Sequence, residues 1–480
     1  MNTIKLAGLE PESVFYYIEQ LCSIPHGSGN TKAISDYLVA FAKEQGLRYI
    51  QDEANNVILF GEASPGYEDR PTVILQGHMD MVCEKDEACP INMDTDALDV
   101  THDGQYVFAK GTTLGGDNGI AVAYAMAILA DRTIVHPPLE VIITVDEEIG
   151  MLGADAIDLS MLKGRTLLNL DSEEEGIFTV ACAGGATATI MLPAPRHPVY
   201  GPCIKLVVDG LQGGHSGVEI HKNRANANKV MGELLNRVRG VMPLCLTSLT
   251  GGAKDNAIPR SCQVTAVMLG MDPERINDIT AQMQAELREK YDEPEAVVTG
   301  DNVEALGGNA LSTELTDQVI KLLCDVPNGV QKMSADIQGL VQTSLNLGIA
   351  NLAEELQLTI SVRSSVNAEK LELLETLKKL AQQSGAEYTQ MGEYPAWEYK
   401  SESRLRDTMV QVYREMYGAQ AQIVAIHAGL ECGLLSEKLP GLDCVSVGPE
   451  MHDIHTSRER LGIQSVKRTW EFILEILKRL

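Results

Sequence analysis

Long apolar runs are missing from this 480-residue sequence: nowhere do about 18 apolar residues follow one another, the length that a membrane-spanning helix requires. The first 21 residues also lack a basic stretch followed by an uninterrupted apolar core, which a secretory signal requires. The ten cysteines include no CxxC pair, and a chain of this size needs no disulfide staples. We therefore expect reduced thiols and a cytoplasmic protein.

Positive charge is also scarce. The chain has 39 Lys and Arg residues against 67 Asp and Glu residues, a formal net charge of −28. This excess repels phosphate backbones and anionic lipids, so we expect neither nucleic acid nor a membrane as a partner. The remaining composition, 44% hydrophobic and 22% charged, is that of a globular protein. The length exceeds what one hydrophobic core usually supports and predicts two or three domains.

Short apolar runs alternate with helical patterns in the first part of the chain. The runs are VILFG at 57–61, TVILQG at 72–77, LEVIITV at 139–145 and TLLNL at 166–170. Helices are predicted at 10–22, 31–45 and 120–130. This order is typical of an α/β domain in which helices flank a buried, mostly parallel sheet.

The pattern of predicted strands and helices changes twice further along the chain. From about 187 to 395, alternating strands such as CIKLVVDGL and LQLTISVRSSV are each followed by a helical pattern, which predicts an α+β domain. From 396 the α/β texture returns, with helices predicted at 405–417 and from 465, and a buried strand CVSVG at 444–448. We therefore predict that 1–186 and 396–480 form one α/β domain and that 187–395 is inserted into it.

Polar residues follow the apolar runs, at the edge of an α/β sheet where ligands collect. The second run leads into His78 and Asp80, whose side chains face the same way on an extended chain. The imidazole could bind a metal while the carboxylate orients it, although a surface His–Asp pair would look the same. Asp117 lies after glycines and ahead of a helix, so it could cap that helix or bridge two cations.

Three successive carboxylates, Asp146, Glu147 and Glu148, end the run LEVIITV. Carboxylates at the end of a buried strand are costly unless a cation or water compensates them. One could bind a metal while its neighbour accepts a proton from a metal-bound water; a solvated charge run is the alternative. The run TLLNL delivers Asp171 to the same edge, followed by three glutamates that we interpret as a solvated loop.

The C-terminal stretch GPEMHDIHTSRER follows the strand CVSVG and offers His452 and His455, one of which is a candidate ligand. With one of them, the edge supplies two His, two Asp and one Glu. Mixed nitrogen and oxygen ligands suit zinc, with manganese or cobalt able to substitute. Five ligands and a base suffice for two ions about 3.5–4 Å apart that share a water of lowered pKa.

The motifs GHMDMV, GTTLGGDNG, VDEEIGMLGA, LNLDSEE and GPEMHDIHTSRERL resemble those of the co-catalytic zinc peptidases, the family of carboxypeptidase G, peptidase V and aminoacylase. The resemblance extends over essentially the whole chain. GGHSG, GGAKDNAIPR and HAGLECG are most similar to the group within this family that hydrolyses Xaa-His dipeptides. The resemblance implies a zinc-peptidase-like catalytic domain interrupted by a lid at 187–395.

The resemblance also implies roles for the residues at the sheet edge. Glu147 would be the general base, and Asp80 would orient a metal-binding histidine. The five ligands would divide between two zinc ions, with one residue shared. They are His78 and Asp171 for the first ion, Asp117 as the bridge, and Glu148 and His455 for the second.

Three residues of the lid are implied as substrate contacts. His215 in GGHSG would stabilise the oxyanion, and Asn256 in KDNAIPR and Arg363 in SVRSS would hold the substrate's carboxylate. Taken alone, His215 could be a loop residue, Asn256 could set a turn and Arg363 could lie at the surface. Their joint occurrence with the metal motifs favours the functional interpretation.

The sequence therefore predicts a metal-dependent dipeptidase that acts on Xaa-His and related dipeptides. An N-acyl amino acid deacylase with the same metal core is the alternative among enzymes. A non-catalytic metal-binding or peptide-binding protein is disfavoured, because Glu147 and every expected ligand are present. A lid of this length could complete the site within one chain, and the sequence is compatible with a monomer or a homodimer.

Overall fold

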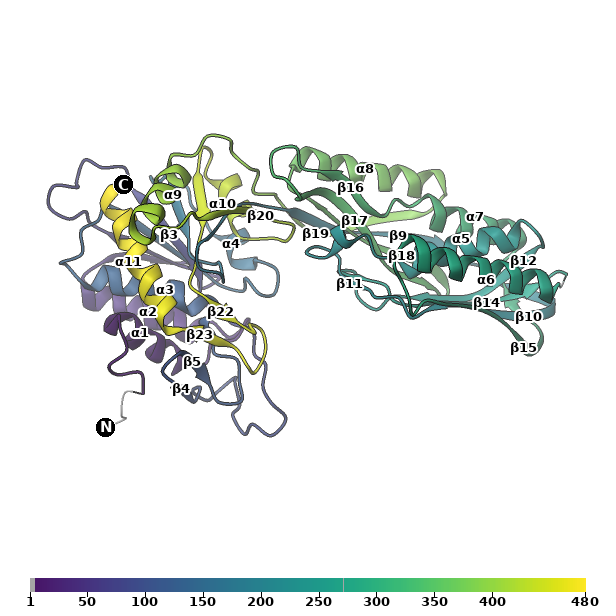
Figure 1. The fold of residues 1–480 in the computed structure, drawn as a ribbon, viewed down its shortest axis with the longest axis horizontal. Coiled ribbons are helices and arrows are strands. Elements are labelled where there is room, and N and C mark those ends of the chain that lie inside the picture. The colour runs from purple at the N-terminus through teal and green to yellow at the C-terminus, as the bar shows by residue number, and fades with distance from the viewer. Residues whose placement is uncertain (1–4, 271) are drawn as a thin grey trace. The chain divides into compact units, whose positions relative to one another are not determined.

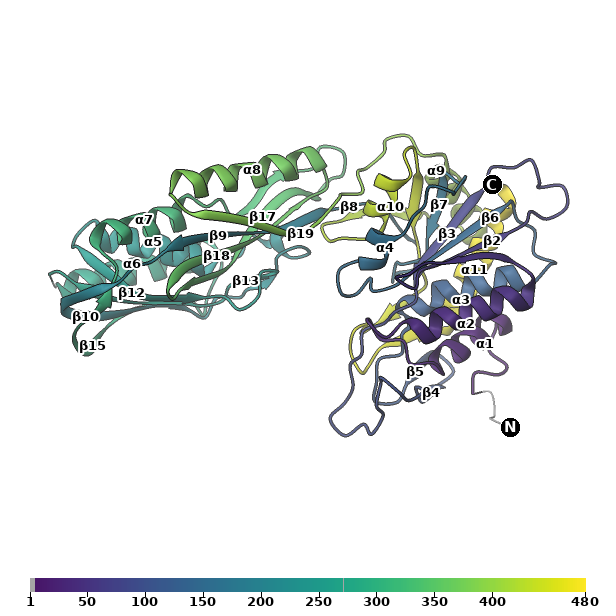
Figure 2. The same ribbon diagram turned by 180° about the vertical axis from the view of Figure 1, so that it is seen from behind.

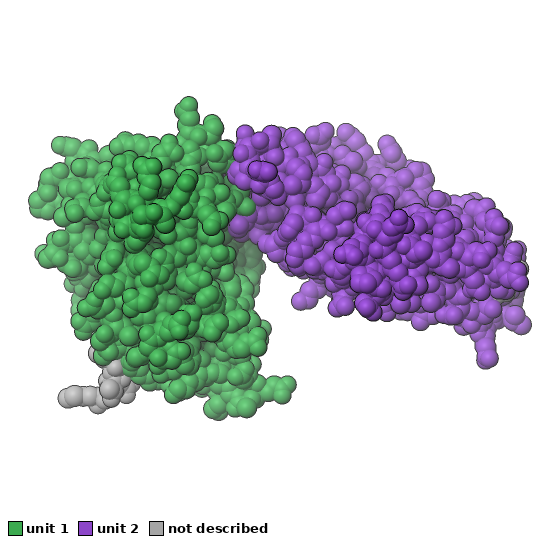
Figure 3. Space-filling view, viewed as in Figure 1, with its two compact units in different colours: residues 1–181, 399–425, 430–480 green, residues 182–398, 426–429 purple. Residues whose placement is uncertain are grey.

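The computed structural model describes residues 5–270 and 272–480, which form two compact units (Figure 3). Unit 1 comprises the chain up to Ala181 together with Tyr399–Ala425 and Leu430–Leu480. Unit 2 comprises Cys182–Glu398 and Ile426–Gly429. The sequence predicts an insertion at 187–395; in the structure the second unit is slightly longer and also includes the four residues at 426–429.

Unit 1 is built on an eight-stranded sheet of order β1-β2-β6-β3-β7-β21-β8-β20 (Figures 1 and 2). The central strands β6, β3, β7 and β21 run parallel to one another. Strands β1 and β2 are antiparallel, as a short connection between neighbouring strands requires, and β8 is antiparallel to β21. The sheet is therefore mixed, with four parallel strands at its centre. The strands are β1 (Arg48–Gln51), β2 (Val57–Gly61), β3 (Val73–His78), β6 (Leu139–Thr144), β7 (Thr166–Asn169), β8 (Ile177–Cys182), β20 (Gln422–Ile426) and β21 (Asp443–Ser446).

Every residue of β3 and β6 is buried, as expected of parallel strands that are covered on both faces. Helix α3 is apolar around most of its circumference and is buried at nearly every position, because it lies inside the core. The helices predicted from the sequence are all present, and the α/β class is confirmed. The helices of unit 1 are α1 (Glu12–Cys22), α2 (Lys32–Gln45), α3 (Gly116–Ala130), α4 (Leu152–Ala156), α9 (Arg404–Tyr417), α10 (Cys432–Lys438) and α11 (Ile463–Arg479).

A small four-stranded sheet of order β22-β23-β5-β4 completes unit 1. It pairs the C-terminal stretch with a hairpin from the first part of the chain, so that Leu461 lies opposite Val107. The loop that carries His452 and His455 is anchored by this pairing. The strands are β4 (Val100–His102), β5 (Tyr106–Ala109), β22 (Met451–His452) and β23 (Arg460–Gly462).

Unit 2 contains a nine-stranded antiparallel sheet with four helices packed on it (Figure 1). A separate two-stranded ribbon pairs β11 (Gly214–His215) with β13 (Ala257–Ile258). The ribbon therefore brings His215 beside the residue that follows Asn256. The sheet strands are β9 (Gly184–Pro193), β10 (His197–Asp209), β12 (Leu244–Gly251), β14 (Cys262–Met268), β15 (Val297–Ala310), β16 (Gly329–Met333), β17 (Val341–Leu352), β18 (Glu355–Ser364) and β19 (Glu387–Tyr394). The helices are α5 (Ala227–Arg239), α6 (Pro273–Lys290), α7 (Thr313–Asp325) and α8 (Asn367–Gln383), and a short 3-10 turn covers Ile220–Lys222.

The structure also bears on the expected absence of a membrane-spanning helix and of disulfides. Within the described ranges, none of the helices has the length and apolar character needed to cross a membrane. The ten cysteines all lie in the described part of the chain, and no disulfide joins any two of them.

Candidate active site

The predicted site residues of unit 1 come together at the carboxyl edge of the central strands. Strand β3 ends at His78, which pairs in register with Thr144, the last residue of β6. On the other side of β3, Gln76 pairs with Asn169, the last residue of β7. The carboxylates that follow β6 and β7 therefore emerge on either side of His78.

His78 is 1% exposed and makes contacts on both sides of its ring. Its Nδ1 lies 3.0 Å from the backbone carbonyl oxygen of Asp80, so Nδ1 carries the hydrogen. Its Nε2 lies 3.4 Å from Asp117 Oδ1 and 3.5 Å from Asp171 Oδ1. Nε2 therefore faces two carboxylates, the arrangement expected if all three groups bound one metal ion.

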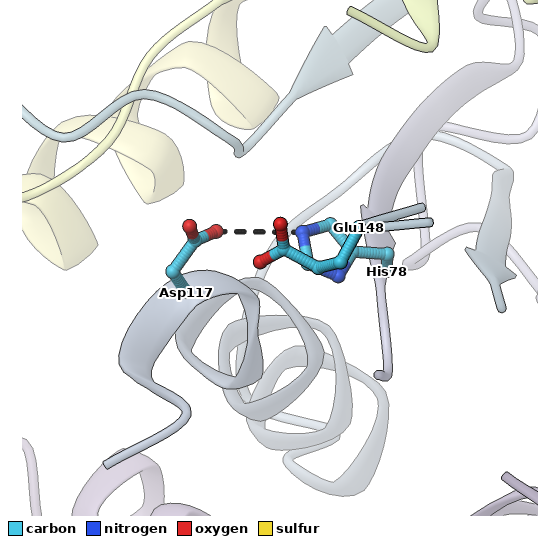
Figure 4. Close-up of side chains that lie close together, drawn as sticks. All are labelled: His78, Asp117 and Glu148. Carbon is cyan, nitrogen blue, oxygen red and sulfur yellow. Dashed lines mark ion pairs between the residues drawn. The ribbon is translucent and has the colours of Figure 1, made fainter. Parts of the chain in front are cut away.

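The second carboxylate oxygen of Asp117 faces a different histidine. Asp117 Oδ2 lies 3.1 Å from His455 Nε2, which in turn lies 2.9 Å from Glu148 Oε1. Figure 4 shows the side chains of His78, Asp117 and Glu148 converging, and ligand atoms of these three lie within 4.8 Å of one another. Asp117 therefore stands between two donor groups: His78 with Asp171, and His455 with Glu148.

The spacing of the first group fits a metal ion. Two ligand atoms bound to one tetrahedral zinc ion at about 2.1 Å lie about 3.4 Å apart. The separations of His78 Nε2 from Asp117 and Asp171 are 3.4 and 3.5 Å. Among the described residues, no lysine or arginine forms an ion pair with Asp117, Glu148 or Asp171. Apart from the two histidines, these carboxylates have no basic partner, and a metal ion would supply the further positive charge that they require.

When no metal ion is bound, protons on the histidines and carboxylates offset part of the negative charge of the site. Burial lowers the pKa of His78, but Asp171, Asp117 and Asp80 raise it well above its usual value. The hydrogen bonds to Asp117 and Glu148 raise the pKa of His455 to about 10. Burial, with Asp117 and Glu148 nearby, raises the pKa of Asp171 to about 6. Metal binding at this site would therefore release protons.

Asp80 lies where the sequence places it, but its carboxylate does more than orient His78. The closest contact of the ring is the carbonyl oxygen of Asp80, while the nearest carboxylate oxygen is 3.5 Å away. Asp80 Oδ1 accepts a hydrogen bond from the backbone N–H of Glu147 at 3.1 Å, and Oδ2 accepts one from Ser28 Oγ at 2.8 Å. Asp80 therefore links the end of β3, which carries the candidate ligand His78, to the candidate base Glu147.

Glu147 is a carboxyl group whose environment suits proton transfer. Burial raises its pKa well above the usual value, and Asp171, Glu431 and Glu148 add to the effect, whereas His78 opposes it. A carboxyl group with a raised pKa is a more effective acceptor of a proton near neutral pH. The third carboxylate of this run, Asp146, instead accepts a hydrogen bond from the backbone N–H of Gly29 at 2.7 Å.

The two C-terminal histidines have different surroundings. His455 contacts Asp117 and Glu148, as described above. His452 lies 3.7 Å from Glu450 and packs edge-on against the ring of Tyr106. The structure therefore brings His455 into the constellation and places His452 outside it.

Glu459 is an important residue of the site whose contacts the sequence does not predict. It is 3% exposed, and its carboxylate accepts hydrogen bonds from the backbone N–H groups of residues 114–117 at 2.8–3.3 Å. Asp117 has non-helical backbone angles, and its two carboxylate oxygens contact His78 and His455. The side chain of Asp117 therefore faces the histidines, and Glu459 holds the backbone of the turn that carries it.

Asn118 connects two of the strand ends. Its Oδ1 accepts a hydrogen bond from the backbone N–H of His78 at 3.2 Å, and its Nδ2 donates to the carbonyl of Leu170 at 2.9 Å. A Cβ at Gly77 would lie 2.3 Å from Asn118 Oδ1, so this contact requires glycine at position 77. A glycine directly before a candidate ligand was the only sequence signal for this close approach.

In unit 2, His215 has the tautomer that an oxyanion donor requires. Its Nδ1 accepts hydrogen bonds from the backbone N–H groups of Gly217 and Val218 at 3.1 and 3.2 Å, so the hydrogen of the neutral ring is on Nε2. Burial and the nearby charge of Arg363 lower the pKa of His215, which keeps the ring neutral. The side chain of Asn256 is exposed, and the backbone carbonyl of Asn256 accepts a hydrogen bond from Ser216 N–H.

Arg363 lies on β18, where its Nη1 donates to Tyr394 Oη at 3.1 Å. Its Nε is buried and has no hydrogen-bond partner among the described residues. A second histidine, His427, is also buried in unit 2, with Nε2 2.7 Å from Ser344 Oγ. Burial and the charges of Arg363 and His215 lower the pKa of His427 to about 3, so this ring is neutral. No pattern in the sequence predicts a role for His427.

Comparison with known proteins identifies the family. A model of peptidase family M20/M25/M40 matches residues 74–479, and the chain belongs to this family. The fold is accordingly that of a metallopeptidase family.

Two relatives cover almost the whole chain. Cytosol non-specific dipeptidase of Escherichia coli (strain K12) is 35% identical over 481 residues, which span 99% of both chains. The crystal structure of aminoacylhistidine dipeptidase from Vibrio alginolyticus is 35% identical, covers 99% of this chain and 98% of its own, and superposes with a TM-score of 0.93. Aminopeptidase PepT from Bacillus cereus is 14% identical with a TM-score of 0.58, covers 98% of both chains and shares the fold.

Proposed function

We propose that this protein is a cytoplasmic dipeptidase that uses two zinc ions and hydrolyses Xaa-His and related dipeptides. One observation carries the proposal: the two carboxylate oxygens of Asp117 face two different histidines, His78 at 3.4 Å and His455 at 3.1 Å. A bridging carboxylate in a dinuclear site has this arrangement. Asp171 would complete the first ion's ligands and Glu148 those of the second.

The chemistry of the donors favours zinc, with manganese or cobalt as substitutes, because nitrogen and oxygen ligands are mixed. When bound, two such ions would lower the pKa of the attacking water and stabilise negative charge on the scissile carbonyl oxygen. Asp80 holds the backbone of Glu147 beside this site through the 3.1 Å hydrogen bond. Glu147 would take a proton from the water and return it to the leaving amine.

The residues of unit 2 would act on the substrate. His215 presents Nε2–H as a donor, which suits the oxyanion of a tetrahedral intermediate. Arg363 keeps a buried Nε without a protein partner, which suits the carboxylate at the C-terminus of a dipeptide. Asn256, whose side chain is exposed on the loop before β13, would support the same carboxylate.

The substrate class is supported by the names of the two full-length relatives, which are dipeptidases. One is named for aminoacylhistidine substrates and the other as non-specific. We therefore propose that Xaa-His dipeptides are hydrolysed among others. The absence of disulfides in the described chain and the name of the cytosol relative support a cytoplasmic location.

A dipeptide panel on the zinc-reconstituted protein tests this proposal. Carnosine and other Xaa-His dipeptides should be hydrolysed, and matched N-acetyl amino acids should not, because only a dipeptidase requires the free amino group. Hydrolysis of N-acetyl amino acids in preference to dipeptides would instead establish a deacylase. Activity that survives complete removal of metal by a chelator would contradict the metal-dependent mechanism.

A further inference from the structure

One buried carboxyl group lies next to the candidate ligands but is not one of them. Glu431 stands at the start of α10, and none of its surface is exposed. Its Oε2 accepts hydrogen bonds from Gln76 Nε2 at 2.5 Å and from Thr144 Oγ1 at 2.7 Å. Gln76 Oε1 in turn accepts one from Asn169 Nδ2 at 2.5 Å. A segment from the C-terminal part of the chain thereby joins the ends of three strands.

The three partners of this network share a position in the sheet. Each stands on a central strand just before a residue or run of the candidate active site. These pairs are Gln76 and His78, Thr144 and the run 146–148, and Asn169 and Asp171. Gln76 and His78 are two residues apart on β3, so their side chains point to the same face, and Thr144 and Asn169 are the last residues of β6 and β7. The network therefore lies at the strand ends, directly before the site residues.

The network is not the arrangement that would stabilise the core most. Glu431 Oε1 and Asn169 Oδ1 are buried without a hydrogen-bond partner among the described residues. Buried polar atoms without partners are destabilising, and apolar side chains of similar shape would avoid that cost. The polar network instead sets the positions of the strands, because its hydrogen bonds fix the strand ends relative to one another.

We propose that Glu431 is a positioning residue of the metal site, which holds the ends of β3, β6 and β7 at the spacing that the ligands require. It acts through Gln76 and Thr144 and does not itself bind the metal or the substrate. The inference rests on the proposed function, because it concerns the same metal site. Groups behind a metal ligand affect metal affinity and activity by about 10-fold to 100-fold.

Two substitutions of Glu431 separate positioning from charge. Glu431→Gln keeps an acceptor oxygen for Gln76 and Thr144, and should bind zinc within about threefold of the wild type. Glu431→Ala removes the acceptor, and should weaken zinc binding and lower kcat by about 10-fold to 100-fold while KM at saturating zinc changes little. If Glu431→Gln is as defective as Glu431→Ala, the carboxyl group acts through its charge and the positioning role is wrong.

A matched control lies near the other end of β6, the strand that ends at Thr144. Glu140 on β6 is 4% exposed and accepts hydrogen bonds from the backbone N–H groups of Lys163 and Gly164, both at 2.9 Å. Glu140→Ala also removes a buried acceptor and should lower the unfolding midpoint, but zinc affinity should stay within about twofold of the wild type. Equal losses of zinc affinity in Glu140→Ala and Glu431→Ala would reduce the effect to general destabilisation and overturn the proposal.

A zinc titration by calorimetry of the wild type and variants decides the outcome. Thr144→Val removes one donor to Glu431 while keeping the shape of the side chain, so it gives a result even if Glu431→Ala does not fold; we expect several-fold weaker zinc binding. A wild type that binds no zinc contradicts the proposed function. A wild type that binds two zinc ions, with Glu431→Ala or Thr144→Val unchanged, leaves the proposed function intact and overturns this inference alone.

Discussion

The carboxylate of Glu459 accepts a hydrogen bond from the backbone N–H of Asp117, a residue 342 positions earlier in the chain. Three further N–H groups of the same loop donate to it. His455 lies four residues before Glu459, so one carboxylate connects the proposed bridging ligand to the loop that carries its histidine partner. Backbone contacts therefore hold Asp117 in place independently of any metal ion.

Replacing Glu459 should therefore damage both the fold and the site. Glu459→Gln places the N–H donors of its amide against backbone N–H donors. It should therefore destabilise the protein as much as Glu459→Ala does, whereas the Gln variant at position 431 should be tolerated. We expect a loss on the order of 3 kcal/mol in the free energy of unfolding, because several buried N–H groups lose a charged acceptor. Chemical denaturation of the metal-free protein measures this loss. A loss below about 1 kcal/mol would show that the Glu459 hydrogen bonds do not hold the turn that carries Asp117.

Glu147→Gln tests the assignment of the base. The variant should keep normal zinc content, because Glu147 is not a ligand, and kcat should fall by about 100-fold to 10,000-fold, because proton transfer is lost. Zinc analysis and steady-state kinetics on the same preparation provide both values. Turnover close to that of the wild type would assign the proton transfer to another group.

His455 and His452 form a natural pair of variant and control. His455→Ala should reduce zinc content from two ions per chain to one, because the second ion loses a ligand. His452→Ala should leave it at two, since that ring contacts Glu450 and Tyr106. Metal analysis after equilibrium dialysis gives the counts, and the reverse pattern would exchange the roles of the two histidines.

Arg363→Ala should raise KM for dipeptides by about 10-fold to 100-fold, because a charged hydrogen bond to the substrate is lost. The same substitution should have little effect on a dipeptide amide, which has no carboxylate. Arg237→Ala is the control within unit 2, since Arg237 pairs with Glu233 and Glu286 on the helices α5 and α6. Equal loss on the dipeptide and its amide would exclude carboxylate recognition.

The stability of the metal-free protein should depend on pH through Glu431. Burial raises the pKa of this carboxyl group from its ordinary value of 4.5 to about 7. The folded protein thus holds the proton more tightly than the unfolded chain, and the resulting stabilisation is full below about pH 4.5 and is lost as pH rises through about 7.

Comparison of the wild type with Glu431→Gln isolates this group. Between pH 4.5 and 7 the wild type should lose up to about 3 kcal/mol more than the variant, since each pH unit between the two pKa values contributes about 1.4 kcal/mol. Urea unfolding at several pH values in the presence of a chelator measures the difference. A constant difference across this range would show that Glu431 titrates normally.

The ligand candidates could be predicted because their signal is local. His78 and Asp171 follow apolar runs, and parallel strands place their carboxyl ends at one edge. The choice of His455 over His452 needed more than the residues themselves, because both follow the same strand; the resemblance favoured His455, and the structure brings it to Asp117.

The residues behind the site could not be predicted in the same way. Glu431 lies 355 positions from Gln76, and no pattern around either residue indicates the contact. Likewise, the pattern of apolar residues does not specify which strands become neighbours, so the sequence predicts a mostly parallel sheet but neither strand β1 nor its antiparallel pairing with β2. These features depend on pairing between distant segments, which a single sequence does not encode locally.

The central claim is that Asp117 bridges two metal ions. Anomalous diffraction from crystals grown with zinc tests it most directly. We predict two peaks about 3.5–4 Å apart, one bound by His78 and Asp171, the other by His455 and Glu148, with one Asp117 oxygen on each. A single peak, or a second peak that Asp117 does not contact, would contradict the account.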